Sequence, residues 1–464
     1  MKLRPLDLRL AEALPAGSLF AVGGRVRDEI RAELEPGAAP PSDSDYVVTG
    51  LELPELIERL GNLGRVDLVG ASFAVAKLTT DGETVDVALP RRERSIGTGH
   101  RDFEVRSGPE VPLADDLSRR DFRMNMMARA LPSGEIVDPY GGEADIRARR
   151  IDILGVNTFV EDPLRMLRGA GFAARFQYAL TDRLRSAMSA AAALIATISP
   201  ERIQDEFAKL LTKASKPSVG FELLRETGLL AHVWPELVEG FGVEQNEWHA
   251  FDVWHHAMAT VDAAPPGDLP LRLAALLHDV GKPRTKDGPH FYRHEIVGAA
   301  MAREMLARVR FSNDVVRVGE LLVRQHMFAA DPALTDAAVR RFIRRVGPEN
   351  IERLFAIRAA DVAGSGLPKR GDHNERFADR VRAEIARKPP FAISDLRVGG
   401  ADVVDALIRR GAAPANFRGD PRVGNALRWL FEQVTDAPEL NERTSLLKLL
   451  ERYLDACDAP SARV

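Results

Sequence analysis

The chain has 464 residues, 45% of them hydrophobic and 28% charged, which is ordinary for globular protein and suggests about three or four domains. A net charge of −4 gives no global signature of nucleic-acid binding, so such binding would need local basic patches. The single cysteine, Cys457, excludes an intrachain disulfide, and no apolar run approaches the ~18 residues of a membrane span, so we expect a cytoplasmic protein without a membrane partner.

A short apolar run at residues 19–22 ends on a glycine pair, Gly23 and Gly24. Apolar residues then recur at helical spacing, at Val26, Ile30 and Leu34. This pattern predicts a strand, a tight turn and a helix. A glycine pair at that turn lets backbone N–H groups approach an anion at the helix N-terminus.

Asp43 and Asp45 stand two residues apart, just before the apolar residues 46–48. On a strand, this spacing puts both carboxylates on one face, where two negative charges favour a Mg²⁺ site. Alone, a glycine pair or an Asp-x-Asp serves turns and caps more often than catalysis. In this order and this close together they resemble the polymerase-β-like nucleotidyltransferases, in which glycines hold a triphosphate and two aspartates hold its metals.

The region up to residue 131 predicts mixed α/β structure, beginning with a short helix and a loop in residues 1–18. Asp81-Gly82 is a strong hairpin signal. Asp86 lies on an alternating strand, either as a third carboxylate beside Asp43 and Asp45 or as a solvent-facing edge residue. The expected elements are a helix at 54–63 and strands at 66–69, 73–78 and 84–89.

Residues 90–112 are aperiodic and rich in arginine, which predicts a mobile loop. Its arginines are Arg91, Arg92, Arg94, Arg101 and Arg106. Beyond residue 142 helix dominates, with loops at 265–267 and 388–390, the latter a plausible domain boundary.

Residues 119–125 read R-R-D-F-R-M-N. The guanidinium forks of Arg119 and Arg120 suit a triphosphate, and Asp121 can accept a hydrogen bond from a ribose hydroxyl. The alternative is a charged helix start with surface ion pairs.

Residues 161–168 read E-D-P-L-R-M-L-R, with Asp162 placed as an N-cap and Pro163 at the first helical position. Arg165 and Arg168 share a helix face with the Asp162 carboxylate. An acceptor beside a fork of donors can pair with the edge of a base. The alternative is an ordinary capped helix with an i,i+3 ion pair.

These motifs, with D-P-Y-G-G at 138–142 and P-E-R-I-Q-D-E-F at 200–207, resemble in sequence and order the bacterial class II tRNA nucleotidyltransferase / poly(A) polymerase family over residues 15–235. The resemblance implies that Asp43 and Asp45 bind Mg²⁺ and that the E-D-x-x-R segment selects CTP or ATP. Arg123 stands where the family usually carries Thr, which leaves nucleotide preference there open. The nucleotide-binding residues that it implies are Gly23, Gly24, Arg27, Asp28, Arg119, Arg120, Asp121, Asn125, Asp162, Arg165 and Arg168.

Histidines and aspartates recur between residues 245 and 365 in the order H…HD…H…H…D, which resembles the HD phosphohydrolase domain. Neutral imidazole and carboxylate suit a divalent metal, although helical histidines can also be satisfied in a core. The implied primary ligands of a metal of unknown identity are His256, His278, Asp279 and Asp361. His294 and His326 would serve a second metal or a phosphate, and His255 is the alternative first ligand.

The sequence therefore predicts a multidomain α/β and all-α protein. The expected domains are a polymerase-β-like head with a mixed sheet (1–138), a helical neck and body (139–244), an HD domain (245–365) and a helical RNA-binding tail (366–464). The expected function is addition of CMP and AMP from CTP and ATP to the tRNA 3′ end, with possible HD-domain hydrolysis. The alternatives are a poly(A) polymerase, an enzyme that adds only CC or only A, and an HD phosphohydrolase whose head only binds nucleotide or RNA. The sequence predicts no oligomeric state.

Overall fold

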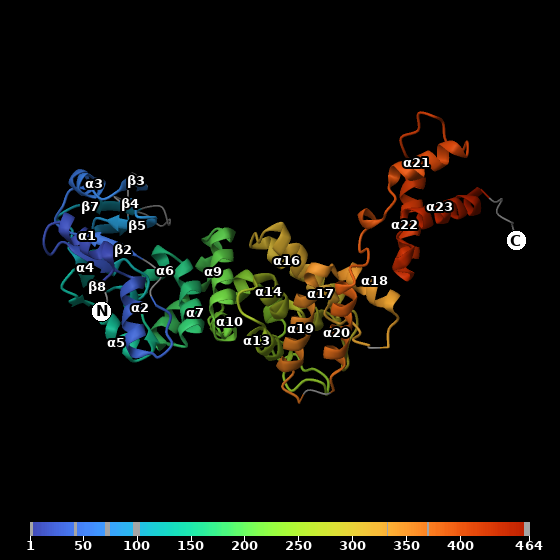
Figure 1. The fold of residues 1–464 in the computed structure, drawn as a ribbon. Helices are drawn as coiled ribbons and strands as arrows, with labels where there is room; N and C mark the ends of the chain where they lie inside the picture. The colour runs from blue at the N-terminus through green and yellow to red at the C-terminus, as the bar shows by residue number, and fades with distance from the viewer. Residues whose placement is uncertain are drawn as a thin grey trace. The chain divides into compact units, whose positions relative to one another are not determined.

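The computed structural model describes residues 3–40, 44–69, 75–95, 103–331, 333–368 and 371–458. The chain forms two compact units, which differ in architecture (Figure 1). The first comprises Met1–Phe241, Pro266–Leu269 and Glu304–Ser312, and the second Gly242–Pro265, Pro270–Arg303 and Asn313–Val464. The boundaries of the four domains expected from the sequence stay a prediction. Within the described ranges, every helix is too short or too polar to cross a membrane.

A mixed sheet forms the framework of the first unit, as predicted. In the described residues it has seven strands in the order β3-β4-β5-β2-β1-β8-β9, with β2 and β5 parallel and the other pairs antiparallel. The strands are β1 (Leu19–Val22), β2 (Asp45–Val48), β3 (Arg65–Val69), β4 (Val75–Thr80), β5 (Glu83–Ala88), β8 (Ala128–Ala130) and β9 (Ile136–Val137).

The predicted strand–turn–helix at the glycine pair is confirmed. β1 lies inside the sheet, so its residues are almost all buried and read as an apolar run. Gly23 has φ +68° and ψ −128°, a conformation open to glycine, and α2 (Gly24–Leu34) begins directly after it.

The hairpin signal at Asp81-Gly82 is also confirmed. Asp81 has φ +51° and Gly82 φ +81°, as a type I′ turn requires, and Thr80 pairs with Glu83 across the turn. On β4 buried and half-buried residues alternate along the strand, which is the period of two that the sequence displays. Strand β4 begins at Val75, whereas the predicted strand began at Phe73, which lies outside the described residues.

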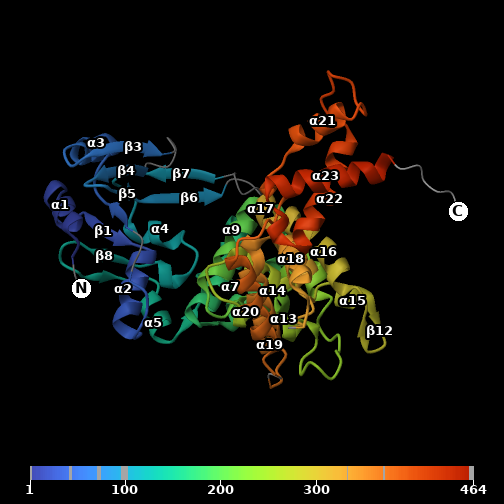
Figure 2. The same cartoon turned by 45° about the vertical axis from the view of Figure 1, so that its right-hand side comes forward.

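Two described segments of the arginine-rich stretch after Pro90 are strands, where a loop was predicted. Strands β6 (Arg91–Ser95) and β7 (Phe103–Ser107) pair antiparallel as a two-stranded ribbon, which Figure 2 shows beside the main sheet. The prediction was wrong because β6 is polar at every position, and in β7 only Phe103 and Val105 show the period-2 alternation that identifies a strand. Arg101 lies outside the described residues.

Helices complete the first unit around the sheet and beyond it. Phe207, Phe221 and Trp234 meet in the core of its helical part, with the Phe207 and Trp234 ring centroids 4.5 Å apart. The further elements are α1 (Pro5–Ala13), α3 (Leu53–Gly61), α4 (Leu113–Ser118), η1 (Arg123–Asn125), α5 (Gly142–Arg147), β10 (Arg150–Ile151), α6 (Thr158–Glu161), α7 (Leu164–Phe176), β11 (Ala179–Leu180), α8 (Asp182–Ala191), η2 (Ala192–Thr197), α9 (Pro200–Lys213), α10 (Pro217–Glu226), α11 (Leu229–Val233) and α12 (Pro235–Val238).

The second unit is almost wholly helical in its described part. Its elements, two of which extend into the first unit, are α13 (Val253–Ala263), α14 (Leu269–Leu277), α15 (Lys282–Thr285), β12 (Lys286–Asp287), β13 (His290–Phe291), α16 (His294–Arg308), α17 (Asn313–Gln325), α18 (Asp336–Val346), η3 (Pro348–Asn350), α19 (Ile351–Gly364), α20 (His373–Ala386), η4 (Ile393–Asp395), α21 (Gly400–Arg409), α22 (Pro421–Asp436), η5 (Pro438–Leu440) and α23 (Arg443–Asp458).

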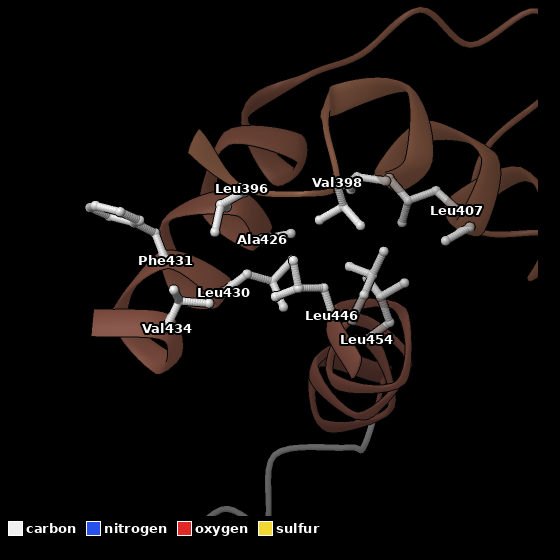
Figure 3. Packing of buried hydrophobic residues seen from close by; sticks show 12 residues of the cluster. Leu396, Val398, Leu407, Ala426, Leu430, Phe431, Val434, Leu446 and Leu454 are labelled. Atoms are coloured by element: carbon white, nitrogen blue, oxygen red, sulfur yellow. The ribbon is translucent and has the colours of Figure 1, made fainter. Parts of the chain in front are cut away.

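The helices after the loop at 388–390 have a core of their own. Figure 3 shows Leu430 of α22 beside Leu446 of α23, with Val398 and Leu454 in the same cluster. The apolar residues of α22 and α23 recur at helical spacing, so each helix presents one apolar face to this cluster.

Candidate active site and metal centre

A cavity of about 450 Å³ in the first unit gathers most of the predicted nucleotide-binding residues. Basic side chains predominate in its wall, as a polyanionic ligand would require. The lining residues are Gly23, Gly24, Arg27, Asp45, Arg119, Arg120, Asp121, Asn125, Asp162, Arg165, Arg168, Gly171, Phe172, Arg175, Glu206, Lys209, Leu210 and Lys213.

The sheet contributes one carboxylate to the cavity wall, that of Asp45, the exposed first residue of β2. Asp43, its predicted partner, lies outside the described residues. Asp86 of β5 is the register partner of Asp45 on the adjacent parallel strand. It does not line the cavity, and its nearest described cation is Lys77, with Nζ 3.9 Å from Oδ1. Two carboxylates on neighbouring strands fit the oxygen ligands that Mg²⁺ prefers, while a third catalytic role for Asp86 stays a prediction.

Gly23 is required at the cavity floor for two reasons. Its positive φ disfavours any side chain, and a Cβ there would overlap Nη1 of Arg120. Arg120 itself is half-buried, with its side chain 18% exposed, and pairs with Asp116 at 3.5 Å. Partial burial lowers the pKa of the Arg120 guanidinium, while the Asp116 charge opposes this shift. A partly desolvated cation of this kind is stabilised by an added anion.

Arg27 is held in place by its neighbours. Its guanidinium donates to both carboxylate oxygens of Asp28, at 2.8 Å each, and to Asn125 Oδ1 at 2.8 Å. It also lies over the rings of Phe172 and Phe176, about 5 Å from each centroid. Asp28 is buried and does not line the cavity, so contrary to its predicted nucleotide contact its side chain orients Arg27.

The R-R-D segment follows the end of α4 and does not begin a helix. Asp121 accepts from Asn125 Nδ2 at 2.7 Å and pairs with Arg168 at 2.7 Å. Burial raises the pKa of the Asp121 carboxyl, but the Arg168 charge and the Asn125 hydrogen bond outweigh it, so the net pKa lies below its ordinary value. The carboxylate therefore stays ionised inside the cavity wall.

The E-D-x-x-R segment spans two helices. α7 begins at Leu164, one residue later than predicted, although the Asp162 carboxylate accepts from the Leu164 N–H at 3.2 Å. The alternative i,i+3 ion pair between Asp162 and Arg165 is absent from the ion pairs of these described residues. Arg165 pairs instead with Glu161 at 3.0 Å, and Asp162 pairs with Arg202 of α9 at 2.9 Å.

Arg123, the departure from the family pattern, points away from the cavity. Its guanidinium pairs with Asp145 at 3.0 Å and with Asp152 at 3.4 Å, and it does not line the cavity wall. These ion pairs link the 3₁₀ turn η1 to α5 and to the residue after β10. The arginine in place of the family's threonine therefore leaves the cavity wall unchanged.

Sequence inspection missed the second half of the wall, which α7 and α9 supply. Gly171, Phe172 and Arg175 continue the helical spacing that starts at Arg168, and this periodicity could have identified them. On α9 the missed residues are Arg202, which pairs with Asp162, and the lining residues Glu206, Lys209, Leu210 and Lys213.

The second unit brings the predicted HD residues into one buried cluster. His256 Nε2 lies 3.0 Å from His278 Nε2, 3.1 Å from Asp361 Oδ1 and 3.4 Å from Asp279 Oδ2. His294 Nε2 and His326 Nε2 lie 3.3 and 3.7 Å from Asp279 Oδ1. Asp279 thus presents one oxygen to each pair of histidines, which gives two adjacent ligand sets that share one carboxylate.

The tautomers of these histidines follow from the hydrogen bonds that their Nδ1 atoms make to backbone carbonyls, outside the cluster. The Nδ1 atoms of His278, His294 and His326 donate to the carbonyl three residues earlier, at 2.7–2.9 Å, and that of His256 donates to Gly364 O at 3.1 Å. Because a carbonyl only accepts, Nδ1 carries a proton, and in the neutral ring Nε2 then keeps its lone pair. Lone pairs converging at 3.0 Å repel unless a cation lies between them, so the donor set fits a divalent metal.

Burial and neighbouring charges set the protonation states of the side chains in this cluster. Burial lowers the pKa of His326 to about 3, and neighbouring positive charge adds to the shift. Burial raises the pKa of Asp279, but the charges of His278 and Lys282 outweigh it and leave the pKa well below its ordinary value. Burial lowers the pKa of His278, but the charges of Asp279 and Asp361 outweigh it and raise the pKa, so metal binding would release a proton from this imidazole.

The structure excludes His255 as the alternative first ligand and adds two residues, His249 and Lys282, to the cluster. His255 is exposed and its Nδ1 lies 2.7 Å from Asp252 Oδ1, so it is not the first ligand. His249 stacks edge-on against His256 with ring centroids 4.7 Å apart, and Lys282 pairs with Asp279 at 2.6 Å. Neither was predicted, although both lie within the motifs at 247–256 and 276–283.

Comparison with known proteins gives matches along most of the chain. Family models match residues 19–152 (poly A polymerase head domain), 177–240 (probable RNA and SrmB-binding site of polymerase A) and 249–363 (HD domain). The multifunctional CCA protein of Cupriavidus taiwanensis is 38% identical over 391 residues, which cover 81% of this chain and 90% of that protein. That of Cupriavidus necator is 37% identical over 343 residues, which cover 70% and 80%. The Bacillus stearothermophilus CCA-adding enzyme in complex with CTP has the same fold, with a TM-score of 0.70 at 23% identity over 98% of this chain and 99% of that one.

Proposed function

We propose that this chain, which belongs to the multifunctional CCA protein family, adds CMP and AMP from CTP and ATP to the 3′ end of tRNA. The observation that carries the proposal is the cavity in which Asp45 and the glycine pair face a wall of arginines. A nucleoside triphosphate offers the anionic oxygens that such a wall binds bidentately. The matched RNA-binding region at 177–240 supports an RNA as the second substrate.

In this reaction the 3′-hydroxyl oxygen of the tRNA forms a bond to the α-phosphorus, and the bond from that phosphorus to the bridging oxygen breaks. Pyrophosphate leaves, and the hydroxyl proton passes to solvent. Gly23, Gly24 and Arg120 bind the triphosphate, and Asp45 together with Asp43 would hold Mg²⁺. A cation bound there offsets the triphosphate charge and acidifies the attacking hydroxyl.

Choice of nucleotide falls to Asp162 and Arg165 in this proposal. Asp162 offers an acceptor and Arg165 a fork of donors at the same wall of the cavity. Both are restrained by partners, Asp162 by Arg202 and Arg165 by Glu161. Restrained donors and acceptors discriminate well, because a wrong base leaves them without hydrogen bonds.

The test is incorporation of CTP and ATP into tRNA transcripts that end before, within and just short of CCA. Asp45→Ala and Asp43→Ala should each abolish incorporation while tRNA binding persists. Asp67→Asn is the matched control, because Asp67 is an exposed carboxylate of the same sheet whose described ion pair is with Arg65. Near-normal incorporation by the Asp45 variant would refute the assignment. It would favour the alternative in which the head only binds nucleotide. The products on the three transcripts distinguish CCA addition from CC-only, A-only or poly(A) addition.

A second activity, metal-dependent hydrolysis of phosphoesters, is supported by the cluster around Asp279. His256, His278, Asp279 and Asp361 would hold the first metal, and His294 and His326 a second. His278→Ala combined with Asp279→Ala should remove bound metal, measured by elemental analysis, together with any phosphatase or cyclic phosphodiesterase activity. Nucleotide addition should survive, since the head has its own carboxylates. A well-folded double variant that fails to add nucleotides would show that the two sites are coupled.

A further inference from the structure

Among the described residues that line the nucleotide cavity, the one aromatic residue is Phe172 of α7. The guanidinium carbon of Arg27 lies 5.1 Å from the centroid of its ring, and that of Arg168 lies 5.8 Å from it. Both distances are within the ~6 Å over which the negative face of an aromatic ring attracts a cation. Phe172 therefore contacts two cations of the cavity wall, which come from two different helices.

The same ring reaches a third segment of the site. The ring of Phe122, the residue after R-R-D, meets that of Phe172 edge-on, with centroids 5.9 Å apart and planes at 87°. Phe122 is fully buried, and a Cβ at Gly169 of α7 would come within 3.1 Å of its ring, so α7 packs closely against this segment. Phe172 thus contacts each of the three segments that supply most of the cavity wall.

Hydrogen bonds and an ion pair also join the two arginines that share this ring. Arg27 Nη1 donates to Asn125 Oδ1 at 2.8 Å, and Asn125 Nδ2 donates to Asp121 Oδ1 at 2.7 Å. Arg168 Nη2 lies 2.7 Å from Asp121 Oδ2. These contacts restrain the nitrogen atoms of the two guanidinium groups, whereas the ring restrains their planes. The two kinds of contact together leave each arginine few alternative positions.

A second ring supports the first. Phe176 is 7% exposed and stacks on Phe172, with centroids 5.4 Å apart and planes 14° apart. The guanidinium carbon of Arg27 lies 5.0 Å from the Phe176 centroid, so this group lies over both rings at nearly the same distance. Arg31, four residues after Arg27 on α2, lies 3.8 Å from the Phe176 centroid. Arginines of α2 therefore pack against aromatic residues of α7, and Phe172 is the ring of this packing that reaches the cavity.

We propose that Phe172 is a positioning residue for nucleotide binding, whose ring holds the guanidinium groups of Arg27 and Arg168 in the orientation that receives the nucleotide. The proposal rests on the nucleotidyl transfer proposed above for this cavity. Arg165 is held by Glu161 instead. Loss of the attraction at the ring should therefore weaken binding of all nucleotides alike and leave the discrimination among bases unchanged.

Site-specific replacement of Phe172 by a monofluorinated and by a pentafluorinated phenylalanine tests this role in the full chain. Fluorine withdraws electron density from the face of the ring, which weakens its attraction for a cation, and changes the size of the ring little. The KM for CTP and for ATP should rise stepwise along the series, about five- to thirtyfold for the pentafluorinated ring. The kcat should change little, because the arginines bind the nucleotide before and during the reaction alike.

Two variants and one control separate positioning from packing. Phe172→Tyr keeps the aromatic face and should retain most of the affinity, whereas Phe172→Leu keeps only apolar bulk and should lose as much as the pentafluorinated ring. In an Arg168→Ala background, fluorination of Phe172 should have a smaller effect, because one of its two cations is gone. The control is fluorination of Phe241, which is 47% exposed, has the Arg225 guanidinium carbon 3.9 Å from its centroid and lies outside the cavity wall. Its KM values, measured at saturating tRNA, should equal those of the wild type.

A constant KM along the fluorine series, or full rescue by Phe172→Leu, would overturn the proposal and leave Phe172 as a packing residue. A loss confined to ATP, and additive with Arg168→Ala, would overturn it in favour of direct stacking of the base on the ring. Equilibrium dialysis of CTP against the same variants measures binding without catalysis. CTP binding that weakens along the series, in a chain whose wild type incorporates no nucleotide, would support the positioning role and refute nucleotidyl transfer alone.

Discussion

Asp7, Arg25 and Tyr46 form a buried network that fastens α1 and α2 to the strand that carries Asp45. Asp7 Oδ1 accepts from Arg25 Nη1 at 2.8 Å and from the Tyr46 hydroxyl at 2.7 Å. Asp7 Oδ2 accepts from Arg25 Nη2 at 2.6 Å and from the Arg4 N–H at 2.8 Å. Because the side chain of Asp7 is 0% exposed and its ion pair is with Arg25, removal of Arg25 leaves a buried carboxylate without a counter-charge.

Arg25→Met removes three charge-assisted hydrogen bonds, two to Asp7 and one to Glu29, each worth about 1.5–3 kcal/mol. We expect a loss of about 3–5 kcal/mol in the stability of the head, the range for breaking one partner out of a buried pair. The double variant Asp7→Leu with Arg25→Met should lose much less, since it leaves no buried charge uncompensated. Tyr46→Phe, which keeps the ion pair, should cost only about 1 kcal/mol.

Hydrogen exchange of the full chain, resolved by peptide, measures these losses locally. Exchange of α1, α2 and β2 amides should quicken about a hundred- to several-thousandfold in Arg25→Met, because each 1.4 kcal/mol corresponds to a factor of ten. Peptides of α22 and α23 serve as the internal control. Less than about tenfold acceleration in Arg25→Met, or a double variant as unstable as the sum of its singles, would refute the argument.

Three further outcomes are expected. Burial raises the pKa of Asp7, but hydrogen bonds to its partners outweigh this and hold the pKa below 3.8. The stability that its ionised form contributes is therefore present above pH 3.8 and lost as the pH falls through the folded pKa, and peptide exchange in α1 across that range should follow it. Gly23→Ala should cost about 1–3 kcal/mol in backbone strain and displace Arg120, which raises the Michaelis constants for both nucleotides. Arg165→Ala should relax discrimination against UTP and GTP about ten- to a hundredfold in four-nucleotide incorporation assays. Arg168→Ala should instead weaken binding of all nucleotides alike. Unchanged discrimination by the Arg165 variant would refute the base-reading role.

Local patterns in the sequence predicted the local structure well. The strand before Gly23, the helix after it and the type I′ turn at Asp81-Gly82 depend on residues within a few positions of one another, so their signals are complete in a short window. The ribbon formed by β6 and β7 depends on pairing between a wholly polar strand and one with a short apolar–polar alternation, so each short window carries little signal.

Side-chain partners were predicted less well because they come from distant segments. Asp162 pairs with Arg202, 40 residues away, in place of the nearby Arg165. Arg123 turns toward Asp145 and Asp152, which no spacing rule indicates. The histidine cluster was the exception, since its order along the chain matched a known family.

The outer hydrogen bonds of the cluster also bear on the order in which the metal centre can assemble. Three of the four imidazoles are oriented by a carbonyl three residues earlier. The orientation of each of these rings is therefore set by residues of its own segment. His256 differs, because its ring is oriented by Gly364, at the end of α19 and 108 residues away. Three ligands can therefore be preorganised while the chain is still folding, whereas the fourth takes its final orientation only when α13 and α19 have docked. Tight metal binding would then indicate that α13 and α19 have packed together.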